Sequence, residues 1–157
     1  MIIKRQKQFS YASDASDEIQ IDNLVLKKTK PMLVGRIIAH FIQQAKYNLE
    51  NSVCYNILES GKKIGEIELF RKSKDEVNIV WIGINKKYQG HGYAQKILGY
   101  FIQKTRKAGF KFMSLEVPGV SPDAKHIYTK FGFKEDGILN GDSDDIWGGL
   151  TSMRLNL

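Results

Sequence analysis

The sequence predicts a mixed α/β fold, in which helices pack on both faces of a mainly antiparallel sheet. Three observations support this: three consecutive strand-like runs in the middle of the chain, an amphipathic helical run directly after them, and a further strand and helix beyond it. A strand, a helix and another strand in succession favour one right-handed parallel crossover. The 157 residues suit a single domain, which we expect to span 1–157.

The first sixty residues contain an expected loop, a helix and a strand. Residues 10–18 are small and polar, which is typical of a flexible loop. Residues 32–47 carry apolar side chains at spacings of three and four, and Pro31 before them suits the first turn of a helix. The strand-like run at 52–60 ends at Gly61, which favours a hairpin turn.

Two further strand-like runs, 63–72 and 76–85, are expected to complete an antiparallel meander. The second run is almost continuously apolar, as expected for a strand covered on both faces. Gly83 inside it is consistent with a bulge or a close approach of another group. The alternative is packing of this glycine against a nearby aromatic side chain.

The remaining chain alternates helices with strands. Residues 91–110 place their apolar side chains on one helical stripe and close near Gly109. Residues 111–118 predict a short strand, and residues 122–133 predict a short helix that ends at Gly132. Residues 144–157 are expected to supply one or two last strands.

Composition and charge limit the partners. The net charge of +7 favours polyanions in general, but the basic residues are widely spread. The sequence has no zinc-ligand spacing, no nucleic-acid-binding motif and no apolar run of about 18 residues. We therefore expect no metal, no nucleic acid and no membrane. The single Cys54, expected to be a buried thiol, and the lack of a secretory signal favour the cytoplasm.

The stretch YQGHGYAQKIL, residues 88–98, begins at the expected junction between a strand and a helix. Main-chain N–H groups at a helix start lack intrahelical partners and, with the helix dipole, favour an anion. Gly90 and Gly92 would let phosphates approach the main chain, and Ala94 keeps the first turn slim. Lys86, Lys87 and Lys96 would add positive charge. The alternative is a simple turn with close packing, and spacing alone predicts only a phosphate-binding helix start.

Two motifs resemble those of the GNAT acetyltransferase superfamily. The residues QGHGYA, 89–94, are similar to its Q/R-x-x-G-x-G/A motif, and AKHIYTKFGF, 124–133, resembles its A-x-x-x-Y-x-x-x-G-F segment. The strands around the first motif also fall where the family has its fourth and fifth strands, so the resemblance covers residues 64–134. It implies a GNAT-like domain whose sheet splays into a V at the parallel pair, with acetyl-CoA as the co-substrate.

The resemblance also implies how acetyl-CoA is held. Main-chain N–H groups of residues 90–95 would hold the pyrophosphate, and the main chain of residues 82–84 would pair with the pantetheine arm. Ser121 replaces an asparagine that is frequent in the family; it would cap the following helix or contact the pantetheine. The expected cofactor-binding residues are Ile82, Gly83, Ile84, Gln89, Gly90, His91, Gly92, Tyr93, Ala94, Gln95, Ser121 and Tyr128.

Two residues are expected to be catalytic. Tyr128 matches the family's tyrosine that donates a hydrogen bond or a proton to the departing sulfur; the alternative is a core tyrosine. Glu116 lies twelve positions earlier, as does a glutamate base in family members that acetylate protein N-termini. The alternative for Glu116 is a structural hydrogen bond, and Glu66 and Glu68 are rival bases.

The expected activity is transfer of an acetyl group from acetyl-CoA to a primary amine, of a small molecule or a protein, by direct attack in a ternary complex. The acceptor stays unidentified. The acidic run at 141–147 would attract a cationic amine, and the alternative is a solvated loop. A monomer or homodimer is expected. The alternative function is a non-catalytic module of the same fold that binds CoA or another protein.

Overall fold

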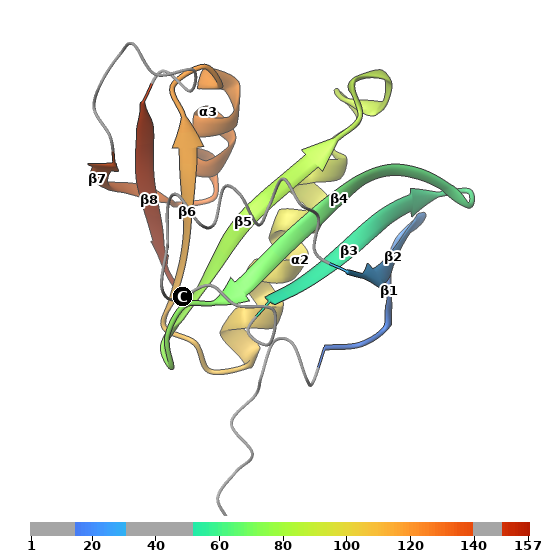
Figure 1. Cartoon of the computed structure of the whole chain (residues 1–157), viewed down its shortest axis with the longest axis horizontal. Coiled ribbons are helices and arrows are strands. Elements are labelled where there is room, and N and C mark those ends of the chain that lie inside the picture. Colours follow the sequence, from blue (N-terminus) through green and yellow to red (C-terminus); the bar gives the residue numbers. More distant parts are fainter. Residues whose placement is uncertain (1–14, 31–51, 140–148) are drawn as a thin grey trace, which may run out of the picture.

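A computed structural model describes residues 15–30, 52–139 and 149–157 (Figure 1). Within these ranges, one sheet contains eight strands in the order β1-β2-β3-β4-β5-β6-β8-β7. Neighbouring strands are antiparallel except β5 and β6, which are parallel. The elements are β1 (Glu18–Ile21), β2 (Leu24–Thr29), β3 (Ser52–Glu59), β4 (Lys62–Arg71), β5 (Glu76–Ile84), α2 (Tyr93–Lys107), β6 (Phe112–Pro118), α3 (Pro122–Lys130), β7 (Lys134–Leu139) and β8 (Leu150–Asn156).

This arrangement confirms the mixed fold with a mainly antiparallel sheet and one parallel pair. The meander β3–β5, both described helices, β6 and β8 lie close to their expected positions. The hairpin β1–β2 and strand β7 were not predicted, and Glu18 at the end of the expected loop already belongs to β1. The helix expected at 32–47, the acidic run at 141–147 and residues 10–14 lie outside the described ranges.

Both described helices lie on the same face of the sheet. Ile97, Leu98 and Phe101 of α2 are buried against the strands, and the Phe101 ring lies 5.9 Å from the ring of Tyr55 on β3. A Cβ atom placed on Gly99 of α2 would lie 3.6 Å from Phe131, at the end of α3. Helices on both faces thus stay a prediction that depends on residues 32–47. No helix in the described ranges is long and apolar enough to cross a membrane.

The sheet opens into a V between its two parallel strands. Residues of β5 and β6 pair from Glu76↔Phe112 to Ile79↔Leu115, and the pairing stops there. Figure 1 shows the two strands together at their starts and apart at their arrowheads. Residues 80–84 of β5 and 116–118 of β6 do not pair with each other and form the arms of the V, and its apex lies at the last pair.

A β-bulge on β5 marks the point where the V opens. Glu68 of β4 pairs with Trp81, but the next residue of β4 pairs with Ile79, which leaves Val80 as the extra residue. The bulge is therefore not at Gly83. A Cβ atom on Gly83 would lie 2.8 Å from Nε1 of Trp81, so the absence of a side chain lets the indole pack over this position.

Candidate active site

A groove of about 710 Å³ occupies the open end of the V. Its walls are the last residues of β5, the first turn of α2 and the first turns of α3, with the loop that precedes each helix. Every expected cofactor-binding residue lines this groove except His91. The two sequence motifs, more than thirty residues apart, are therefore brought together around one space.

A 3₁₀ turn, η2 (Lys86–Tyr88), follows β5, and the glycine loop, residues 89–92, leads from it into α2. Gly90 has φ +82° and Gly92 has φ +76°, in the left-handed region that strains residues with a Cβ atom. Gly92 is the N-cap of α2 and has no side chain to cap the helix. The first intrahelical hydrogen bond comes from Lys96, so the N–H groups of residues 93–95 are open to a ligand. With the positive end of the helix dipole, these groups can bind an anion such as a diphosphate.

Side chains of the glycine loop hold the loop itself. Nε2 of Gln89 donates to the Ile84 carbonyl at 2.8 Å, which ties the loop to the end of β5. Nδ1 of His91 lies 3.1 Å from the carbonyl oxygens of both Tyr88 and Gln89, so it carries a proton and donates. The His91 ring stacks on Tyr93, with 5.5 Å between the ring centroids. His91 therefore supports the loop from outside the groove.

The tips of two hairpins contact the first turns of α2. The Tyr93 hydroxyl donates to the Glu59 carboxylate, and this hydrogen bond, with burial, raises the pKa of Tyr93. Nδ2 of Asn23 donates to the same carboxylate at 2.9 Å. Lys96 forms an ion pair with Asp22 at 2.9 Å, so its charge is shared with that carboxylate. None of these contacts was predicted, because they join segments far apart in the sequence.

Tyr128 faces the groove from α3. Its ring packs edge-on against Phe133 at 5.9 Å, and burial raises the pKa of its phenol to about 12. The phenol is therefore protonated at neutral pH and can donate a hydrogen bond. Among the described residues, its hydroxyl has no hydrogen-bond partner, so the donor is available to a ligand in the groove.

Glu116 lies at the apex of the V and is not part of the groove lining. It is the first residue of β6 beyond the last pair with β5. Nδ2 of Asn78, on β5, lies 3.2 Å and 3.4 Å from its two carboxylate oxygens. The structural hydrogen bond considered as an alternative is thus present, and it does not exclude a role in proton transfer.

The rival bases lie on β4. Glu66 pairs with Gly83 in register and Glu68 pairs with Trp81, so both share one face of the sheet with the indole, as their spacing predicts. Glu66 forms an ion pair with Lys63 at 3.2 Å. Glu68 is 2% exposed.

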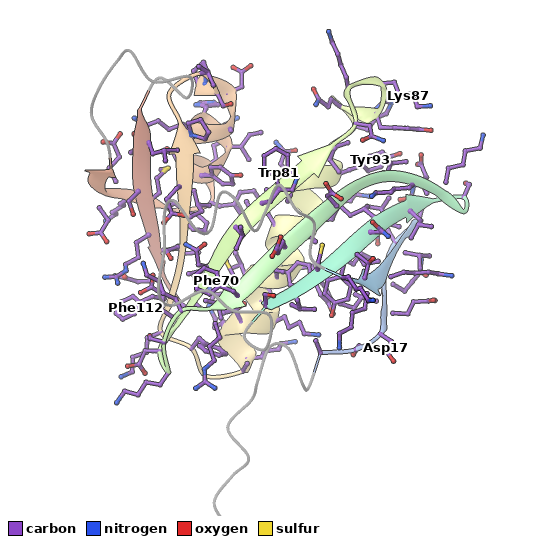
Figure 2. All side chains as sticks on the ribbon, viewed as in Figure 1. Asp17, Phe70, Trp81, Lys87, Tyr93 and Phe112 are labelled. Atoms are coloured by element: carbon purple, nitrogen blue, oxygen red, sulfur yellow. The ribbon has the colours of Figure 1, made fainter. Side chains whose placement is uncertain are left out.

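Several residues that line the groove were not predicted from the sequence. Trp81 and Val120, 38% and 62% exposed, are the exposed large hydrophobic side chains among the described residues, and both line the groove. Figure 2 shows Trp81 beside the end of β5. In a continuously apolar strand, nothing in the sequence separates an exposed tryptophan from a buried one. Ser121 occupies the N-cap of α3, with Pro122 at the first helical position as expected, but its hydroxyl makes no capping bond.

The chain matches a family model. The acetyltransferase (GNAT) family matches residues 20–133, which is more than half of the chain. This range contains the glycine loop, Glu116 and Tyr128. No curated protein was matched.

Solved structures share the fold at low sequence identity. A GNAT family acetyltransferase from Elizabethkingia anophelis, with acetyl-CoA bound, has a TM-score of 0.68 at 16% identity and covers 87% of this chain and 99% of its own. A Bacillus subtilis acetyltransferase in complex with CoA has a TM-score of 0.62 at 19% identity, with 84% and 99% covered. The ribosomal-protein-S18-alanine N-acetyltransferase from Escherichia coli has a TM-score of 0.62 at 19% identity, with 83% and 93% covered.

Proposed function

The chain belongs to the acetyltransferase (GNAT) family, and from this premise we propose that it transfers the acetyl group of acetyl-CoA to a primary amine by direct attack in a ternary complex. Acetyl-CoA is the co-substrate of the family. The observation that carries the proposal is the continuous groove from the unpaired end of β5, past the open amides of α2, to Tyr128.

The residues of the groove fit the parts of acetyl-CoA. The N–H groups of residues 93–95 would bind the diphosphate, and Gly90 and Gly92 keep side chains away from it. Residues 82–84 of β5 have no strand partner on the side of the V, so their main chain would pair with the amides of the pantetheine arm. Bound there, acetyl-CoA supplies an activated acetyl thioester.

Tyr128 would act on the sulfur of the leaving group. The raised pKa keeps a proton on the phenol oxygen, so the side chain is a hydrogen-bond donor throughout the neutral range. A donor directed at a sulfur that gains negative charge stabilises the transition state more than the ground state. The ring is fixed by its contact with Phe133, which limits the orientations of the hydroxyl.

Glu116 would accept the proton of the attacking amine, directly or through one water molecule. An amine must lose its proton to act as a nucleophile, and Glu116 offers a carboxylate at the apex of the V, where the pairing of β5 with β6 stops. Glu66 and Glu68 stay alternatives, because they line the same face next to Trp81.

A panel of amines and peptides tests the proposal, with release of free thiol from acetyl-CoA as the readout and melting temperature as the binding readout. Amine-dependent release, with kcat lowered about 100-fold or more by Glu116→Gln, would support it. Stabilisation by acetyl-CoA with no turnover on any acceptor would favour the non-catalytic module. If acetyl-CoA does not raise the melting temperature at all, the groove is not its binding site.

A further inference from the structure

The closed end of the V contains a row of polar side chains, which we call the polar ladder. It comprises Arg154, Glu76, Ser114, Asn78 and Glu116, from β8, β5, β6, β5 and β6. In the sheet, Ser114 pairs with Asn78 on one side and with Arg154 on the other. The ladder therefore crosses three adjacent strands and ends at the apex.

The hydrogen bonds of the polar ladder fix the orientation of the Asn78 amide. Nη2 of Arg154 donates to Oε2 of Glu76 at 2.7 Å, and the Ser114 hydroxyl is among the groups that lower the pKa of this carboxyl. An amide NH₂ group only donates, so Nδ2 of Asn78 donates to Oγ of Ser114, at 3.0 Å. The Asn78 amide is thereby oriented with its NH₂ group toward β6, and its second N–H points to the Glu116 carboxylate.

Packing alone does not explain an asparagine at this position. Asn78 is 1% exposed, and its Oδ1 has no hydrogen-bond partner among the described residues. A buried acceptor without a partner costs stability, and an apolar side chain of similar size would avoid that cost. The features that an apolar side chain could not supply are the two donors, one to the buried Ser114 hydroxyl and one to Glu116. The donor to Glu116 is the one that reaches the apex.

We propose that Asn78 is a positioning residue, which holds the Glu116 carboxylate at the apex of the V in the orientation needed to accept a proton from the acceptor amine. This inference rests on the proposed function, because it requires Glu116 to be the base. An amide anchors a carboxylate without adding a positive charge, which would compete with the amine for it. In contrast, Glu66 and Glu76 are held by cations: Glu66 forms an ion pair with Lys63, and Glu76 forms one with Arg154.

Asn78→Leu tests the inference, alone and combined with Glu116→Gln. Misplacement of a catalytic group by about 1 Å costs roughly 100-fold, so Asn78→Leu should lower kcat about 10- to 100-fold and leave KM for acetyl-CoA unchanged. In the Glu116→Gln background, Asn78→Leu should have no further effect on kcat, because the group that it positions is absent. Asn56→Leu, on β3, is the matched control and should keep wild-type kcat.

The outcomes separate this inference from the proposed function. If Glu116→Gln is fully active, Glu116 is not the base and the positioning role fails, while acetyl transfer with Glu66 or Glu68 as the base stands. If the wild type acetylates no acceptor, the proposed function fails. If Glu116→Gln is impaired but Asn78→Leu has wild-type kcat, or lowers kcat equally in both backgrounds, the positioning role alone is overturned. Should Asn78→Leu not fold, Asn78→Ser, whose side chain is too short to reach the carboxylate, is compared in the same cycle.

Discussion

The closed and open halves of the β5–β6 pair use the same two strands in opposite ways. In the closed half, the main chains pair with each other, and Glu76, Asn78 and Ser114 are buried polar side chains bonded within the polar ladder. In the open half, the main chain of residues 82–84 is unpaired toward the V, and its side chains are apolar or absent. At the closed end, the main-chain N–H and C=O groups of the two strands pair with each other. At the open end, the corresponding groups of β5 are not paired with β6 and can pair with a ligand.

The open half should be the most sensitive to mutation at the start of α2, where we propose that the main chain binds the diphosphate. Gly92→Val places a β-branched residue at φ +76°, and the strain of about 1–2 kcal/mol moves the amides of the first turn of α2. With the loss of charge-assisted hydrogen bonds to phosphate, we expect KM for acetyl-CoA to rise about 100-fold.

Gly109→Val is the matched control for this prediction. Gly109 has φ +86° at the other end of α2, and a Cβ atom there would have no neighbour within 4 Å. The two variants should lose similar stability in urea unfolding, but only Gly92→Val should weaken acetyl-CoA binding. An equal rise of KM in both would mean that strain acts through global stability and not through the glycine loop.

Tyr128 tests whether the open half also contributes a side chain to the reaction. Tyr128→Phe keeps the contact with Phe133 and removes only the hydroxyl, so we expect kcat to fall about tenfold, the value of one hydrogen bond to a developing charge. KM for acetyl-CoA should be unchanged. A wild-type kcat for this variant in steady-state assays would assign Tyr128 to packing.

Glu76→Gln tests the closed half. Burial would raise the pKa of Glu76, but hydrogen bonds from Ser114 and Arg154 and the charges of Lys72 and Arg154 outweigh burial and lower it. Because the folded pKa is below the unfolded one, the ionised carboxylate stabilises the fold above pH 4.5, and this contribution is lost as the pH falls through the folded value.

Urea unfolding at two pH values measures that contribution. At pH 7, Glu76→Gln should be less stable than the wild type by about 1–3 kcal/mol, and the difference should shrink below pH 4.5. Acetyl-CoA should bind both proteins equally. A stability difference that does not change with pH would show that the charge of Glu76 does not stabilise the closed half.

The smallest effect is expected at Gly83. An alanine Cβ would lie 2.8 Å from Nε1 of Trp81, so the indole must rotate at a cost of about 0.5–1.5 kcal/mol. In a Trp147→Phe background, where Trp81 is the remaining tryptophan, Gly83→Ala should change the emission maximum while the melting temperature moves little. An unchanged spectrum would mean that the indole does not rest on Gly83.

Local patterns were enough to predict the elements that form most of the V. The apolar stripe of α2 and the runs of β4 and β5 have periodicities that can be read within one segment, and the glycine loop requires a local backbone conformation. Strands β1 and β7 have 4 and 6 residues and are stabilised by partners elsewhere in the chain, so no local pattern shows them.

The polar ladder illustrates what the sequence could not predict. Asn78 and Ser114 are 36 positions apart, and their contact depends on the register of a parallel pair. The same register places Glu116 immediately beyond the last pair. A glutamate or an asparagine in a strand pattern gives no sign of whether it faces solvent, another side chain or the apex of a V.

The central claim is that the unpaired amides at the start of α2 bind the diphosphate of CoA, and backbone amide NMR measures this most directly. On titration with CoA, the ¹H–¹⁵N signals of Gly92, Tyr93, Ala94 and Gln95 should show the largest shifts, while those of Ser114 and Arg154 in the closed half stay nearly constant. Saturable shifts confined to other residues, or no shifts at millimolar CoA, would contradict the account.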